Sequence, residues 1–112
     1  MPFRLSNCVC LTTPEMQKAS EFYRNTLGLQ IKSEVNEGLE FEAGSLRFFI
    51  NPGGPPTLAM EFLVPDLEKA REELVAAGCE VVKWEGKGRD CYVRDPYGLL
   101  FNLWEDPQAF RK

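Results

Sequence analysis

The sequence predicts an α+β fold of two βαβββ modules, whose curved mixed sheets enclose a cleft while the helices lie on the outer faces. The order strand, helix, three strands occurs twice along the chain. The segment Pro52-Gly53-Gly54-Pro55-Pro56 separates the two copies, because it cannot continue a central strand. Each copy has one helix, which covers one face of a four-stranded sheet, so the other face must find a partner. We therefore expect a single domain over residues 1–112, with module one at 1–51, a linker at 52–57 and module two at 58–112.

Module one begins with a strand from Arg4 to Thr12. Thr13-Pro14 provides an N-cap and a proline at the first helical position, and apolar residues then recur at helical spacing as far as Gly28. A turn is expected at Asn36-Glu37-Gly38 and another at Gly44-Ser45. The three remaining strands are expected at Leu29–Val35, Leu39–Ala43 and Leu46–Asn51.

Module two repeats this order. After a strand over Leu58–Val64, Asp66 caps a helix that ends at Gly78. Strands follow at Cys79–Trp84 and Asp90–Arg94. The turn Asp95-Pro96-Tyr97-Gly98 then leads into an apolar run that only Asn102 interrupts before its end at Glu105, as is typical of a strand buried on both faces.

The composition excludes several classes of function. The formal net charge is -4, which argues against a nucleic-acid binder. No apolar segment approaches the ~20 residues of a membrane span, and no signal-peptide pattern opens the chain, so we expect a cytoplasmic protein. The four cysteines lack paired C-x-x-C spacings, and reduced thiols fit them best. The absence of histidine removes the commonest transition-metal ligand and the usual general base at neutral pH.

Three segments resemble the vicinal oxygen chelate superfamily of glyoxalase, bleomycin-resistance and ring-cleaving dioxygenase proteins. They are Ala19–Leu29 with its F-Y-x-x-x-L-G-L pattern, Val64–Ala70, and Asp95–Gly98 with the strand that follows. The resemblance covers nearly the whole chain and implies paired βαβββ modules with a cleft between their sheets. Catalytic members of that family hold a divalent metal with His, Glu or Gln side chains from four cleft-lining strands. The matching positions in this sequence are Cys8, Phe48, Ala59 and Asn102.

This set of residues does not suit a metal. Phe48 and Ala59 have no ligand atom, Asn102 offers a neutral oxygen and Cys8 a soft sulfur. We therefore expect no metal and no cofactor, and we assign no catalytic residue.

The strand alternation predicts which side chains line the cleft. The expected ligand-binding residues are Cys8, Cys10, Phe48, Ile50, Ala59, Glu61, Asn102 and Trp104, with Leu63 and Leu100 beside them. Phe48 and Trp104 can stack on an aromatic ligand or bind a cation. Glu61, the only carboxylate among these residues, either pairs with a ligand cation or reaches solvent at the cleft mouth. Asn102 either contacts a ligand or hydrogen-bonds a neighbouring backbone.

We therefore expect metal-free binding of a small hydrophobic, aromatic or cationic molecule in the cleft, with drug or metabolite sequestration as the bleomycin-resistance-like role. The alternative is a lyase, isomerase or oxygenase of the glyoxalase or dioxygenase type that uses a divalent metal. A third hypothesis is a non-catalytic interaction module. The expected partners are the small-molecule ligand and a second copy of the chain. Because the three prolines of the linker disfavour a tight fold-back, we expect a homodimer that exchanges modules, although closure within one chain would give almost the same contacts.

Overall fold

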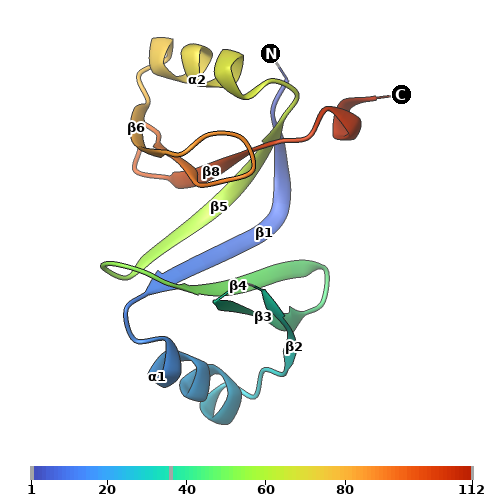
Figure 1. Cartoon of the computed structure of the whole chain (residues 1–112), viewed down its shortest axis with the longest axis vertical. Helices are drawn as coiled ribbons and strands as arrows, with labels where there is room; N and C mark the ends of the chain where they lie inside the picture. The colour runs from blue at the N-terminus through green and yellow to red at the C-terminus, as the bar shows by residue number, and fades with distance from the viewer. Residues whose placement is uncertain (1, 36, 112) are drawn as a thin grey trace. The chain divides into compact units, whose positions relative to one another are not determined.

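The computed structural model describes residues 2–35 and 37–111, which form two compact units (Figure 1). The N-unit comprises Asn7–Leu58. The C-unit joins the N-terminal segment up to Ser6 with the chain from Ala59 onward. Asn36, within the first predicted turn, lies outside the described residues.

The N-unit is a mixed four-stranded sheet with a helical segment on one side (Figure 1). The strand order is β2-β3-β4-β1, in which β1 runs parallel to β4 while β3 is antiparallel to both of its neighbours. Its elements are β1 (Arg4–Thr13), α1 (Met16–Glu21), the π-helix η1 (Phe22–Thr26), β2 (Ile31–Val35), β3 (Gly38–Ala43) and β4 (Leu46–Pro52).

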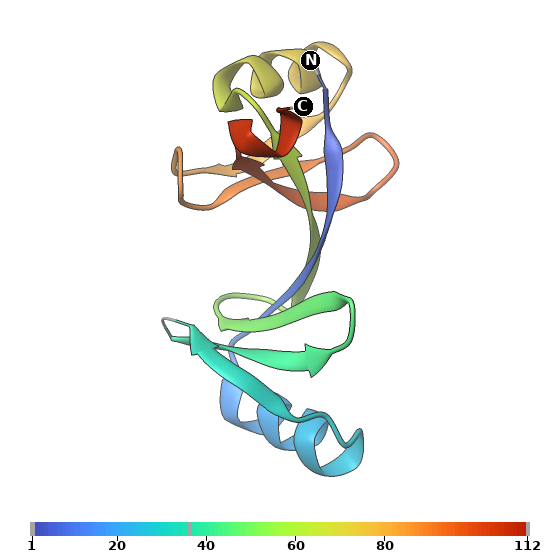
Figure 2. The same cartoon turned by 90° about the vertical axis from the view of Figure 1, so that its right-hand side faces the viewer.

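The C-unit has the same arrangement, with α2 on one side of its strands in both views (Figures 1 and 2). Its strand order is β5-β8-β7-β6, in which β5 is parallel to β8 and the other pairs are antiparallel. Its elements are β5 (Thr57–Val64), α2 (Leu67–Ala76), β6 (Glu80–Trp84), β7 (Cys91–Arg94), β8 (Leu100–Glu105) and the 3-10 helix η2 (Pro107–Phe110). The repeated order of one helix and four strands confirms the predicted α+β fold.

The predicted helix caps are only partly correct. Asp66 caps α2, because its Oδ1 accepts the backbone N–H of Lys69 at 3.0 Å. Thr13 does not cap α1: its hydroxyl accepts the N–H of Glu15 at 3.2 Å, and the helix begins one residue after Glu15. Gly28 has a φ of 76°, as expected for a residue that follows a helix. Neither α1 nor α2 is long and apolar enough to cross a membrane.

The N-unit core lies between the sheet and its helical segment. The ring of Tyr23 packs edge-on against Phe48 at 5.5 Å and against Phe41 at 6.0 Å, measured between ring centroids. Phe41 and Phe48 are register partners on β3 and β4, so their side chains share one face of the sheet. Ile50 lies two residues further along β4 on the same face and is fully buried. The prediction that Phe48 and Ile50 line the cleft is therefore wrong, because both face the helix.

The error comes from aligning the two final hairpins on their turn glycines. In the N-unit hairpin only Gly44-Ser45 separates the paired residues Ala43 and Leu46. In the C-unit hairpin the longer loop from Asp95 to Leu99 separates Arg94 from Leu100. Each glycine lies two residues before its following strand pairs, but the closing pair Ala43–Leu46 faces the helix. The closing pair Arg94–Leu100 faces away from the helix, so residues matched from the two glycines lie on opposite faces. On β4 the residues that face away from the helix are Arg47, Phe49 and Asn51.

The C-unit core has the predicted alternation. Its fully packed cluster lies under α2 and consists of Val64, Leu67, Ala70, Cys91, Val93, Phe101 and Leu103. Register places Glu61 beside Asn102 and Leu63 beside Trp104, one residue out of step with this cluster. Glu61, Asn102 and Trp104 therefore project from the face opposite α2, as expected.

Candidate functional site

Each unit has a sheet face that its own helix does not cover, and we call these the N-face and the C-face. The N-face carries Cys8, Cys10, Glu40, Arg47, Phe49 and Asn51, which the strand register places on one side. The guanidinium of Arg47 lies over the ring of Phe49, 4.9 Å from its centroid. The N-face is therefore more polar than the sequence predicted, because a stacked Arg–Phe pair stands where Phe48 and Ile50 were expected.

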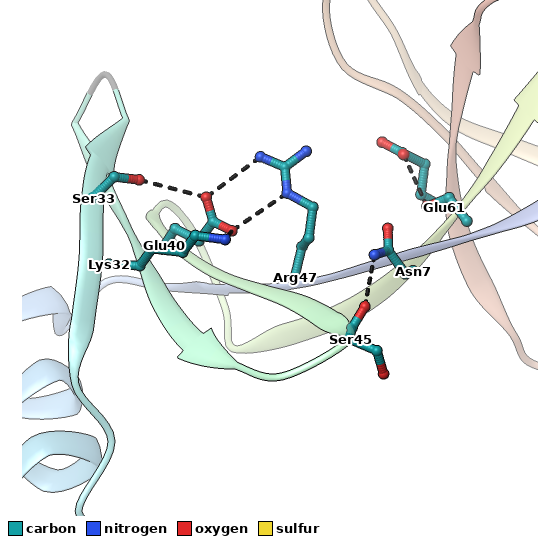
Figure 3. A network of polar contacts seen from close by, with 8 residues as sticks. Asn7, Lys32, Ser33, Glu40, Ser45, Arg47 and Glu61 are labelled. Carbon is teal, nitrogen blue, oxygen red and sulfur yellow. Dashed lines mark hydrogen bonds and ion pairs between the residues drawn. The ribbon is translucent and has the colours of Figure 1, made fainter. Parts of the chain in front are cut away.

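A buried carboxylate holds this arginine in place (Figure 3). Glu40 is only 4% exposed, and it accepts two hydrogen bonds from Arg47, through Nε and Nη2, both at 3.3 Å. The hydroxyl of Ser33 donates to the same carboxylate at 3.4 Å, and the Lys32 ammonium lies 3.8 Å away. The hydrogen bond from Arg47 holds the pKa of Glu40 below its ordinary value of 4.5, although burial acts in the opposite direction. Glu40 thus fixes the orientation of Arg47 on the N-face.

Two asparagine side chains connect β1 to the segments beside it. Asn51 donates from Nδ2 to the sulfur of Cys10 at 2.9 Å. Asn7 donates from Nδ2 to the carbonyl oxygen of Ser45 at 2.7 Å, which ties β1 to the turn between β3 and β4 (Figure 3). Cys8 and Cys10 both lie on this face and are partly exposed.

The C-face is apolar and aromatic. Trp104 is 40% exposed and lies next to Leu63 in register. Leu100 and Ala59 share the face but are nearly buried. Glu61 is partly buried and accepts a hydrogen bond from the Ser6 hydroxyl at 3.0 Å. The C-face therefore presents an exposed indole and, at the next register pair on the same face, a hydrogen-bonded carboxylate.

Asn102, the amide within the final strand, forms a backbone contact. Its Oδ1 accepts the N–H of Cys91 at 2.8 Å, from the neighbouring strand β7. Cys91 is fully buried, so this bond satisfies a donor that has no access to water. The side-chain oxygen of Asn102 thus has a structural role as the acceptor for a buried donor.

Sequence reasoning missed a second carboxylate, Glu105, at the end of β8. Its Oε1 accepts the N–H of Leu67 at 2.8 Å, in the first turn of α2, and its Oε2 lies 2.8 Å from the Lys87 ammonium. The hydrogen bond from Lys87, followed by that from the Leu67 backbone, lowers the pKa of Glu105. The sequence carries no signal for this role, because Leu67 and Glu105 lie far apart along the chain and meet only in the folded structure.

The structure also shows which side of the sheet Trp84 faces, which the sequence did not decide. It packs against the C-unit core, its Nε1 donates to Glu68 at 3.3 Å, and the guanidinium of Arg71 covers its ring at 4.8 Å. Both of these partners belong to α2, so Trp84 supports the helix side of the sheet.

A hollow of about 210 Å³ lies on the helix side of the C-unit, away from the C-face. Its walls are mostly apolar, and they include the thiol of Cys79. Burial, with a smaller contribution from Asp95, raises the pKa of this thiol, so it is a poor nucleophile. The hollow is lined by Phe3, Phe62, Leu74, Cys79, Asp95, Leu99 and Phe101.

Two units that each contain a βαβββ sheet, with a parallel pair and an antiparallel hairpin in the same order, define the class of paired-module α+β proteins. The family model described as Glyoxalase/Bleomycin resistance protein/Dioxygenase superfamily matches residues 5–103. The chain therefore belongs to this superfamily. A search of the curated proteins gives no match.

Solved structures agree with this fold. A glyoxalase/bleomycin resistance protein/dioxygenase superfamily member from Vibrio splendidus 12B01 aligns over 94% of this chain and 100% of its own, with a TM-score of 0.62 and 16% identity. A hypothetical protein from Bacillus halodurans C-125 aligns over 100% of both chains, with a TM-score of 0.63 and 12% identity. A variant of homoprotocatechuate 2,3-dioxygenase from B. fuscum aligns over 92% of this chain but 32% of its own, with a TM-score of 0.60 and 22% identity. This chain therefore spans about a third of that dioxygenase, and the likeness is one of fold.

The residues at the family's metal-ligand positions do not fit a divalent metal. Ala59 has no donor atom, and the oxygen of Asn102 accepts a backbone N–H. On β4 the open face presents Arg47 and Phe49, neither of which is a metal ligand, and the amide of Asn51 is bound to Cys10. Within residues 2–35 and 37–111, no group of three or more His, Cys, Asp or Glu side chains could hold a metal ion. Cys8 offers a soft sulfur in place of a nitrogen or oxygen ligand, and one thiolate with one neutral amide oxygen does not make a site for a hard or borderline ion.

Proposed function

We propose that this protein binds a small aromatic or hydrophobic molecule on its open sheet faces without the divalent metal of its catalytic relatives. The exposed indole of Trp104 on the apolar C-face carries the proposal. The indole N–H of an exposed tryptophan can form a hydrogen bond to solvent or to a partner, so exposure leaves no polar group unsatisfied. Its ring offers a surface on which an aromatic ligand can stack. Glu61 beside it supplies an acceptor for a cationic or hydrogen-bonding group of the ligand.

The N-face extends the range of ligands. The stacked pair of Arg47 and Phe49 presents a planar guanidinium and a ring to the same side, so it suits a ligand that carries both an aromatic ring and a polar substituent. Cys8 and Cys10 provide small, weakly polar contacts beside this pair. In this proposal the role is sequestration of a drug or metabolite, and the reducing cytoplasm is the compartment that suits four cysteines present as thiols.

The metal-free part of the proposal rests on side-chain chemistry. A glyoxalase or dioxygenase mechanism requires open metal coordination positions held by several protein ligands. Ala59 has no donor atom, and Asn102 offers only a neutral oxygen that already accepts a backbone N–H. The likeness to a dioxygenase supports the fold only, and it does not restore these ligands.

We also propose that the open faces are buried in a homodimer, in which the N-face of one copy closes on the C-face of the other. The support is that each face keeps apolar side chains that water would otherwise contact, such as Phe49 and Trp104. The linker residues between β4 and β5 include two prolines in an exposed segment, which favours exchange between chains over a tight reversal. Light scattering at micromolar concentration tests this proposal, since a single 12.8 kDa species would contradict it.

A thermal-shift screen tests the proposed function. We expect planar aromatic metabolites and cationic antibiotics to include ligands that stabilise the protein, by about 2.7 kcal/mol when present at 100 times the dissociation constant. The hits should lose most of their effect in Trp104→Ala and keep it in Trp84→Phe, because Trp84 packs on the helix side. Equal stabilisation of both variants and the wild type would mean that the C-face is not the site.

A further inference from the structure

The N-face carries a pair of thiols whose capacity to bind a metal ion the proposed function does not use. Cys8 and Cys10 lie two residues apart on β1, so their side chains project to the same side of the sheet. Two strand steps separate their Cα atoms by about 6.6 Å. Register with β4 agrees, because Cys8 pairs with Arg47 and Cys10 with Phe49, which stack on each other. Both cysteines are partly exposed in the single chain.

The surroundings of the two thiols favour sulfur as an electron-pair donor. Asn51 donates an N–H to the sulfur of Cys10 at 2.9 Å, while the S–H of Cys10 faces the carbonyl oxygen of Leu11 at 4.0 Å. Arg47 stands beside Cys8 in the parallel pairing of β1 with β4. Hydrogen-bond donors and cations stabilise a thiolate relative to a thiol. Asn51 therefore supplies a hydrogen-bond donor to one sulfur, while the charge of Arg47 is paired with Glu40.

We propose that Cys8 and Cys10 form a two-coordinate site for a soft monovalent cation, Cu(I) in particular. Thiolates select soft ions such as Cu(I), whereas zinc needs four ligands and calcium or magnesium needs oxygen ligands. When the ion binds, two S–H bonds break, two protons pass to solvent and two S–Cu bonds form. Neither copper nor sulfur changes oxidation state. The product carries one negative charge and stays partly exposed to solvent, which screens it.

This site does not depend on the proposed organic ligand. The N-unit supplies both thiols, Asn51 and Arg47, so the ion requires neither the C-face nor a second copy of the chain. An aromatic ligand that covers Cys8 and Cys10 would compete with the ion. Copper binding and ligand binding can therefore fail separately.

The test is a Cu(I) titration of the reduced protein under anaerobic conditions, in competition with a chromogenic Cu(I) chelator. We expect one ion per chain for the wild type. Cys8→Ser and Cys10→Ser should each weaken retention of Cu(I) at least tenfold. Cys79→Ser is the matched control, because this partly buried thiol lies in the C-unit and should leave the titration unchanged. Circular dichroism checks that each variant is folded.

X-ray absorption of the copper-loaded wild type gives a second test that needs no variant. It should show two sulfur neighbours and no nitrogen or oxygen ligand. A first shell of nitrogen or oxygen, one ion per two chains, or unchanged retention of Cu(I) in both serine variants would overturn the proposal. Loss of binding in Cys79→Ser would also overturn it, since the ion would then be bound elsewhere.

Discussion

The side-chain oxygen of Asn102 accepts the backbone N–H of Cys91 at 2.8 Å, across the β7–β8 pair. This bond occupies the one polar group that interrupts the final apolar strand. Cys91 is fully buried, so its N–H has no alternative partner in water. The contact is therefore structural.

We expect Asn102→Ala to destabilise the fold by about 1–3 kcal/mol, because it leaves a buried donor unsatisfied. Urea denaturation measures this loss. Asn7→Ala is a matched control, since Asn7 also forms a side-chain bond to a backbone group but is exposed, and it should cost well under the loss at Asn102. Equal losses in the two variants would show that the bond to the Cys91 N–H contributes no more to stability than an exposed side-chain bond.

Replacing Glu105 should weaken the start of α2. Glu105→Ala removes the acceptor for the N–H of Leu67, which we expect to cost about 1–2 kcal/mol in free energy of unfolding. Glu105→Gln keeps an acceptor oxygen but loses the ion pair with Lys87, so its loss should be smaller. Chemical denaturation of both variants checks this order, and a larger loss in the glutamine variant would contradict the assigned contact.

Acid should destabilise the protein through Glu40 in the N-unit. Its pKa in the folded state lies below the ordinary value of 4.5, so its contribution to stability is present above that pH and is lost as the pH falls through the folded pKa. We expect Glu40→Gln to be less stable than the wild type at pH 7 and to lose less stability on acidification. Glu42→Gln, with an exposed side chain, is the control. If the unfolding free energy of Glu40→Gln fell with decreasing pH as steeply as that of the wild type, Glu40 would not be the source of the acid sensitivity.

The direction of the β4 side chains can be tested with two neighbouring residues. Phe48→Ala should cost about 3 kcal/mol or more, because it removes the ring that packs against Tyr23 and Phe41. Phe49→Ala should cost clearly less, since Phe49 lies on the N-face with Arg47. Thermal denaturation of the two variants decides the point. A greater loss of stability in Phe49→Ala would mean that Phe49 faces the helix and Phe48 faces the open side, as the sequence suggested.

Much of this fold could be predicted from the sequence because each module carries its own local signals. Asp66 and Gly28 mark helix ends through ordinary capping chemistry, and the apolar alternation of β5 and β8 placed Glu61 and Trp104 on the correct face. The alternation of β4 could not be predicted, because Phe48, Phe49 and Ile50 are all apolar and give no period of two. The direction of these side chains is shown by the pairing of β4 with β3 and by the packing of Phe48 against the ring of Tyr23.

Long-range contacts account for the rest. The bonds from Glu40 to Arg47 and from Glu105 to Leu67 join residues whose proximity arises only when the strands pair. For Asn102, the sequence left a ligand contact and a backbone contact open, and the structure shows a backbone contact. A polar residue in an apolar strand therefore identified a special position but not the partner that it meets.

Titration calorimetry of the strongest hit from the thermal-shift screen, with and without a metal chelator, tests the proposed metal-free binding most directly. We predict the same dissociation constant under both conditions, and a loss of about 1–3 kcal/mol in binding free energy for Trp104→Ala. Binding that disappears with the chelator and returns with stoichiometric iron, manganese, nickel or zinc would contradict the account.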